Sequence, residues 1–200
     1  MAQGDIDNIL DFWFGELNRW GMPVNDRNPL WFGYQQTTDQ LIEQQFGELV
    51  ASALAGKLND WRQQPNGSIA LVILLDQFTR NIFRGTARAF SGDPLALALS
   101  HALVTDKKDN LLPAIYRVFL YIPYEHSENI EHQRSAVALF DQLVKDSAEP
   151  IREQIASFKR YAQAHYKVIN KFGRFPHRNT VLGRSSTKAE LAHLEEHGGF

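Results

Sequence analysis

The sequence contains no cysteine, so it can form neither a disulfide nor a cysteine-based metal or nucleophile site. No run approaches the roughly 18 consecutive apolar residues of a membrane-spanning helix. The first ten residues, MAQGDIDNIL, carry two acids where a secretory signal would place lysine or arginine before an apolar stretch. From these absences we expect a cytoplasmic protein with no membrane partner.

Motifs for nucleotides and cofactors are also missing. There is no Walker loop, no dinucleotide-binding glycine motif and no G-x-S-x-G elbow. HLEEH at 193–197 fits the H-x-x-E-H pattern of some zinc peptidases, but only three residues follow it, so no later ligand is available. We therefore assign no cofactor and no metal ligands, and leave open whether a set of histidines and carboxylates binds a metal.

Acidic residues are absent from one long stretch. The net charge of −2 predicts no general affinity for nucleic acid. Between Glu153 and Glu190, however, the chain has no acid and eight basic residues, which are Lys159, Arg160, Lys167, Lys171, Arg174, Arg178, Arg184 and Lys188. We expect the C-terminal third to attract an anion.

Apolar residues follow a helical period almost throughout, and no strand shows sustained alternation. The first half predicts a helix that ends at Gly15, a second helix from Thr37 or Thr38 to Gly56, and a third for which Ser68 is a plausible N-cap. Two hundred residues lie within the range of one domain.

The second half continues the helical pattern. A helix is expected to begin at Asp93, followed by one broken around Pro123 and one capped by Ser127. A clean apolar seam then runs from Ile151 to Phe172, with Gly173 as its stop and a capping box at Thr187 and Glu190. The sequence thus predicts a single all-α domain over residues 1–200, with about eight helices in α-hairpins.

The stretch LLDQFTRNIFRG at 74–85 is the first concentration of polar side chains. It continues an apolar helix, yet five polar residues share one arc at 100° per residue: Asp76, Gln77, Arg80, Asn81 and Arg84. Asp76 and Arg80 can pair at i,i+4. The arc is either the wall of a polar pocket or the solvated end of a core helix.

A second concentration lies in the loop at 171–186, which carries Arg174, His177, Arg178, Asn179 and Arg184 among aromatic residues. Arginine forks suit carboxylate or phosphate groups. The alternative is a surface loop whose arginines pair with acids elsewhere in the chain.

A third set lies around a helix junction at 121–128, where Glu125, His126, Ser127 and Glu128 follow a proline. A carboxylate beside an imidazole supports acid–base work or metal ligation, whereas Ser127 and Glu128 also fit helix capping. His165, on the apolar seam, is either a satisfied core residue or an acid–base group.

Together these stretches resemble a bacterial family, domain of unknown function 924. The resemblance rests on LWF at 30–32, DQFTRNIFRG at 76–85, AFSGDPLA at 89–96, YIPYEHSE at 121–128 and FGRFPHRNTVLGRSST at 172–187. It implies a tetratricopeptide-like superhelix and says little about function. The polar positions that match the family motifs are Asp76, Gln77, Arg80, Asn81, Arg84, His126, Ser127, Glu128, Arg174, His177, Arg178, Asn179 and Arg184.

Two functional hypotheses follow. In the first, the three segments enclose a pocket for a small anion, such as a phosphate, a carboxylate or a phosphorylated metabolite, with a hydrolase-type reaction as its extension. Its ligand-binding residues are Gln77, Arg80, Asn81, Arg84, Arg174, Arg178, Asn179 and Arg184, and its catalytic candidates are Asp76, His126, Glu128, His165 and His177. In the second, the protein is a helical scaffold for a peptide or protein, with a buried structural polar network.

Overall fold

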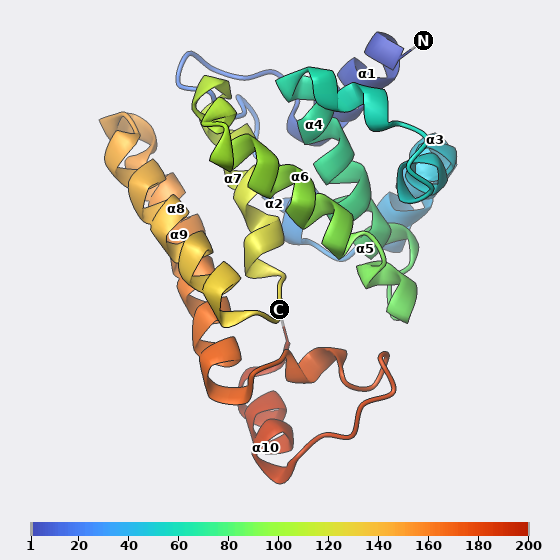
Figure 1. The fold of residues 1–200 in the computed structure, drawn as a ribbon, viewed down its shortest axis with the longest axis vertical. Helices are drawn as coiled ribbons and strands as arrows, with labels where there is room; N and C mark the ends of the chain where they lie inside the picture. Colours follow the sequence, from blue (N-terminus) through green and yellow to red (C-terminus); the bar gives the residue numbers. More distant parts are fainter. Residues whose placement is uncertain (1, 200) are drawn as a thin grey trace.

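The computed structural model describes residues 2–199, with side chains from residue 3, and over that range the chain is all-α (Figure 1). The α-helices are α1 Ala2–Phe14, α2 Asn28–Phe32, α3 Gln36–Leu54, α4 Pro65–Val72, α5 Thr79–Ile82, α6 Asp93–Thr105, α7 Ala114–Glu125, α8 Ile130–Asp146, α9 Glu149–Phe172 and α10 Lys188–His197. Shorter helical segments are η1 Asn59–Gln63, η2 Ile73–Phe78, η3 Ala87–Phe90, η4 Lys108–Leu111 and η5 Pro176–Arg178. The predicted all-α class is confirmed.

One hydrophobic core connects α1 through α9. At its centre, edge-to-face aromatic contacts join α1 to the middle of the chain: Trp13 lies 5.4 Å from Phe78 and 5.7 Å from Phe119 between ring centroids. Phe14 packs against Phe119 in the same way, at 5.3 Å. The strongly apolar stretch at 69–75 belongs to the same core and is buried on all sides.

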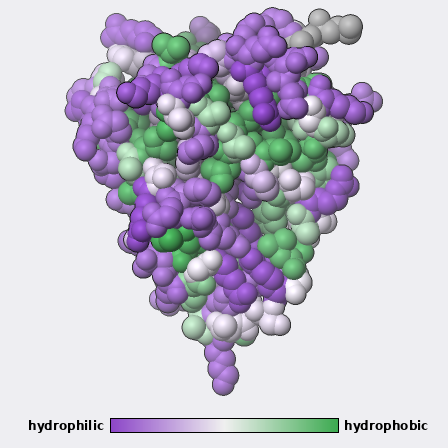
Figure 2. Space-filling model, viewed as in Figure 1, coloured by the Kyte–Doolittle hydropathy of each residue, from purple (hydrophilic) through white to green (hydrophobic). Residues whose placement is uncertain are grey.

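Helices α8 and α9 form a long pair on one side of the molecule, and α10 lies at the tapered end beyond them (Figures 1 and 2). The predicted seam of α9 is buried at Ile151, Ile155, Phe158, Ala162, His165 and Ile169. Gly173 ends the helix with φ of +70°, and the predicted capping box of Thr187 and Glu190 is present. After α10 the chain returns towards the middle of the molecule. The tetratricopeptide-like stacking of hairpins stays a prediction.

Three of the expected helix boundaries are wrong. Helix α4 begins at Pro65, so Ser68 is a buried interior residue rather than an N-cap. Helix α7 continues through Pro123 to Glu125 instead of breaking at the proline. Asn129, not Ser127, caps α8, because its side chain accepts a hydrogen bond from the backbone N–H of Glu131. At α4 and α8 a neighbouring residue provides the N-terminus, Pro65 in the first and Asn129 in the second.

Segments α4, η2 and α5 make one rod whose middle, Ile73–Phe78, widens into a π-helix. The wider turn weakens the regular hydrogen bonds of the helix backbone, and side chains donate hydrogen bonds to two of the carbonyl oxygens. The Thr79 hydroxyl donates to the Leu75 carbonyl at 2.7 Å, and an Arg80 N–H donates to the Asp76 carbonyl at 2.6 Å. The predicted polar arc therefore begins inside an irregular turn, a feature often found at functional sites.

A glycine beside this turn brings α6 close to the rod. A Cβ on Gly92 would overlap the carbonyl oxygen of Leu75, so only glycine allows this approach. The approach places Asp93, the first residue of α6, next to Arg80.

Hydrophilic side chains dominate the face shown in Figure 2, with apolar residues in scattered patches. Within the described part of the chain, no helix combines the length and apolar character needed to cross a bilayer.

Candidate functional site

A cavity of about 540 Å³ lies where the rod, the end of α7 and the segment after α9 come together. Its lining includes predicted site residues from all three segments, which are Gln77, Arg80, Asn81, Arg84, His126, His165, His177 and Arg178. Aromatic residues complete the wall: Trp31, Phe32, Phe90, Phe158 and Tyr161. The structure thus brings together predicted site residues that are up to 101 positions apart in the sequence.

Asp76 and His126 form a buried pair at this junction. His126 Nδ1 donates to Asp76 Oδ1 at 2.7 Å, and the side-chain amide of Gln77 donates to Oδ2. Burial alone would raise the pKa of Asp76, but the charges of Arg80 and His126 and these hydrogen bonds lower it to about 2. Burial and the charge of Arg80 lower the pKa of His126. At neutral pH the carboxylate therefore holds a neutral imidazole by Nδ1, which leaves Nε2 as the basic nitrogen.

Arg80 is held by two carboxylates. Its guanidinium makes a two-pronged contact with Asp93, at 2.8 and 3.0 Å, and lies 3.2 Å from Asp76 Oδ1. Such a planar double contact fixes both the position and the orientation of the guanidinium. Arg80 therefore has most of its donors engaged before any ligand binds.

Arg178 lies beside it and makes fewer hydrogen bonds. It is 6% exposed, and Nη1 makes both of its hydrogen bonds, to the His126 carbonyl at 3.0 Å and to Asp93 at 3.4 Å. The guanidinium also lies over the rings of Phe90 and Phe175, 4.5 Å from each centroid. Its buried Nε has no acceptor among the residues that the structure describes. Burial and the charge of Arg80 lower the pKa of Arg178 to about 10. The buried guanidinium of Arg178 and the partly buried one of Arg80 thus share the carboxylate of Asp93, and Arg178 has unused donors.

Two further histidines in the wall are uncharged at neutral pH. Burial is the main cause in both, and it lowers the pKa of His165 to about 3 and that of His177 to about 4, with neighbouring positive groups adding to the effect. The His165 Nδ1–H donates to the Tyr161 carbonyl at 2.9 Å. Glu125, which also lines the cavity, is buried, and burial together with the charge of Asp76 raises its pKa well above the usual value.

The outer part of the polar arc is tied to α3. Asp39 accepts from Asn81 at 2.7 Å and from Arg84 in a two-pronged contact at 2.7 and 3.0 Å. The Arg84 guanidinium also lies over the ring of Tyr34, 5.1 Å from its centroid. Asp39 and Asp93 were not among the predicted site residues, although both hold arginines of the cavity.

The remaining predicted residues do not line this cavity. Arg184 makes a two-pronged contact with Glu128, at 2.6 and 2.9 Å, and Glu128 also accepts from the Phe175 backbone N–H. Asn179 is buried and accepts from Arg184 Nε at 3.0 Å. Their contacts join the loop at 173–187 to the start of α8.

Two more members of the family motifs have local partners. Arg174 makes a two-pronged contact with Glu190, at 2.6 and 2.9 Å, which joins the end of α9 to α10. Ser127 Oγ lies 2.8 Å from His132 Nδ1.

The pair of Glu128 and Arg184 allows a test of whether the residues outside the cavity have a structural role. Replacing Arg184 with alanine is expected to lower the free energy of unfolding by about 1–3 kcal/mol, because it leaves a half-buried carboxylate short of donors. Urea denaturation measures the change. Arg160→Ala, which removes an exposed pair with Glu153, is the control and should change stability by less than about 1 kcal/mol. Equal effects of the two substitutions would contradict a structural role for the pair.

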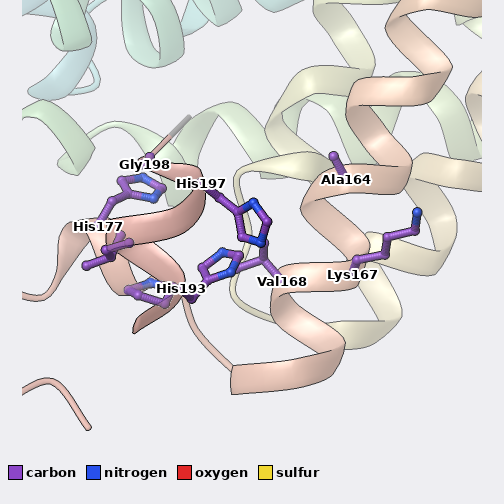
Figure 3. A pocket seen from close by; sticks show the side chains of 10 residues that line it. Ala164, Lys167, Val168, His177, His193, His197 and Gly198 are labelled. Carbon is purple, nitrogen blue, oxygen red and sulfur yellow. The ribbon is translucent and has the colours of Figure 1, made fainter. Parts of the chain in front are cut away.

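A smaller cavity of about 300 Å³ lies between α9, η5 and α10 (Figure 3). His177 and Gly199 line both cavities. The rings of His193 and His197 lie side by side, 4.7 Å apart between centroids, and His177 lies across from them. Among the described side chains, no group of three or more histidines and acids is close enough to hold a metal ion.

The chain matches one family model over residues 9–198, that of a bacterial protein of unknown function, DUF924. The solved structure of a protein of unknown function, ATU0120 from Agrobacterium tumefaciens, is similar at 31% identity with a TM-score of 0.81. That similarity covers 98% of this chain and 99% of the other. No curated protein matches the chain. The chain therefore belongs to the bacterial DUF924 family, as the motifs at 30–32, 76–96, 121–128 and 172–187 predict.

Proposed function

We propose that the large cavity binds a small anion, a carboxylate or a phosphate, and that His126 transfers a proton to or from it. The main support is Arg178, a buried arginine in the cavity wall whose Nε has no acceptor among the described residues. A carboxylate or phosphate oxygen would supply the missing acceptor. The volume of about 540 Å³ is in the range of small-molecule sites, which favours this ligand over a bound peptide.

The other residues take roles that follow from their contacts. Asp93 and Asp76 hold Arg80, so that two guanidiniums stay side by side without a bound anion. Asp76 also orients His126, which makes it a positioning residue rather than a group that contacts the ligand. Gln77 and Asn81 present amides in the same wall and fit neutral groups of the ligand.

Hydrolysis of an ester of the bound anion fits this arrangement. His126 Nε2 accepts a proton from water while the water oxygen attacks the carbon or phosphorus atom. The same proton then passes to the leaving oxygen as the ester bond breaks, so the reaction consumes one water. His126→Gln is expected to lower kcat by about 10²–10⁴-fold with a chromogenic carboxylate or phosphate ester. If the variant retains wild-type kcat, His126 has no part in proton transfer.

Thermal shift and calorimetry with inorganic phosphate and acetate test the anion site directly. We expect the wild-type protein to be stabilised and Arg178→Gln to lose at least about tenfold in affinity, since a charge-assisted pair contributes roughly 1.5–3 kcal/mol. Arg178→Lys keeps the charge and should lie between them.

Arg160→Gln, at an exposed ion pair, is the matched control and should bind as the wild type does. If neither anion stabilises the wild-type protein, the anion site is refuted.

A further inference from the structure

The wall of the large cavity changes character along α9. Phe158, Tyr161 and His165 all line it at spacings of three and four residues, so they lie on one face of the helix. From Phe158 to His165 the helix rises about 10 Å at 1.5 Å per residue. One end of this wall is aromatic, and the other carries an imidazole close to the arginines.

Two aromatic rings at the aromatic end lie nearly parallel. Phe32 and Tyr161 have ring centroids 6.2 Å apart and an interplanar angle of 8°. They are 56% and 58% exposed, and both line the cavity. Phe158 lies beside Phe32, with centroids 6.2 Å apart. Exposed apolar surface at the rim of a polar cavity is typical of a ligand-binding surface.

We propose that the anion bound in this cavity carries an aromatic ring on a short linker. The ring packs on Phe32 and Tyr161, and the carboxylate or phosphate binds Arg178. This proposal rests on the proposed function, which supplies the anionic end. It adds the chemical class of the ligand, an arylalkyl carboxylate or phosphate. We infer the linker from the length of the wall, because α9 rises about 10 Å from Phe158 to His165, which is longer than a ring bonded directly to a carboxylate.

The aromatic character of the ligand follows from the geometry of the wall. Flat rings gain about 0.5–1.5 kcal/mol from offset or edge-to-face contact with other rings beyond the burial of their area. A saturated ring of similar size buries similar area without that gain. The difference between the two measures aromatic recognition separately from hydrophobic burial.

Calorimetry with propionate, 3-cyclohexylpropionate and 3-phenylpropionate tests this inference. We expect propionate to bind most weakly, and 3-phenylpropionate to bind about 2–12-fold more tightly than its cyclohexyl analogue, which is the ring gain expressed as affinity. Benzoate, which lacks the linker, should bind more weakly than 3-phenylpropionate. In the double variant Phe32→Leu, Tyr161→Leu, the phenyl and cyclohexyl compounds should bind equally, while the affinity for propionate is unchanged.

Tyr166→Leu is the matched control. Tyr166 lies on α9, as Tyr161 does, but does not line the cavity, so this variant should keep the preference for the phenyl compound. Equal affinity of the two ring compounds for the wild-type protein would overturn the aromatic inference and leave the anion site intact. The same holds if the preference survives in the double variant. Failure of every carboxylate and of inorganic phosphate to bind would overturn the proposed function itself.

Discussion

Asp76→Asn is expected to lower the free energy of unfolding by about 3–5 kcal/mol, the usual cost of removing one partner from a buried ion pair. Asp76 is completely buried and contacts His126, Gln77 and Arg80 at once. The substitution keeps the shape of the side chain but removes the charge. Arg80 then keeps only one carboxylate partner, Asp93, and His126 loses its ionic partner. Chemical denaturation at pH 7 measures the change.

Asp141→Asn is the matched control, because it makes the same chemical change at an ion pair on the surface. We expect it to affect stability far less, since solvent screens exposed charges. Below its melting temperature, the Asp76→Asn variant should remain helical by circular dichroism. Its kcat should fall, because His126 is no longer oriented for proton transfer. If Asp76→Asn is no more destabilising than Asp141→Asn, the buried charges do not form one network.

Acidification from pH 6.5 to 4.5 is expected to destabilise the protein steeply. His165 and His177 have native pKa values of about 3 and about 4, because burial opposes their charged forms. In this interval the unfolded chain binds a proton at each histidine and the native state does not. Each histidine therefore removes about 1.4 kcal/mol of stability per pH unit as the pH falls.

Glu125 acts in the opposite direction. Its pKa is raised well above the usual value in the native state, because burial and the charge of Asp76 oppose ionisation. The native carboxyl therefore takes up its proton at a higher pH than the unfolded one, and this gain offsets at most about one histidine. His126, whose native pKa is also lowered, adds to the loss. The net expectation is a loss of about 1.4 kcal/mol per pH unit or more, measured by urea denaturation at a series of pH values.

His165→Gln should flatten this dependence by about 1.4 kcal/mol per pH unit, since glutamine does not titrate. The comparison uses the slope with pH, so a constant change in stability from the substitution itself does not affect it. His177→Asn should act in the same direction. An unchanged slope in both variants would mean that neither histidine is neutral in the native protein.

The convergence of the three polar segments was predictable in outline. The arc from Asp76 to Arg84 continues a wholly apolar helix, and a charge in such a place needs a partner or a cavity. The sequence did not distinguish the residues that line the cavity from those that form ion pairs in the surrounding structure. Arg178 and Arg184 lie in the same loop and have the same chemistry, yet one lines the cavity and the other pairs with Glu128.

Asp39, Asp93 and the aromatic wall were missed for a related reason. Asp93 has the local pattern of a helix start, and it is one, but close contact at Gly92 also places it against Arg80. Phe32 and Tyr161 lie more than 120 positions apart and have no shared pattern. Long-range partners of this kind depend on how helices pack, which local periodicity does not encode.

The sequence by itself determined the helical class, most helix ends, the absence of cysteine chemistry and the family, because hydrophobic spacing, capping residues and motifs are local properties of the chain. Only the tertiary structure decided which buried arginine nitrogen lacks an acceptor among the described residues, which histidine contacts a buried carboxylate and which aromatic rings lie side by side. Those properties arise from desolvation and distance, and both are set when α2, the rod, α7, α9 and the loop after α9 pack around one cavity.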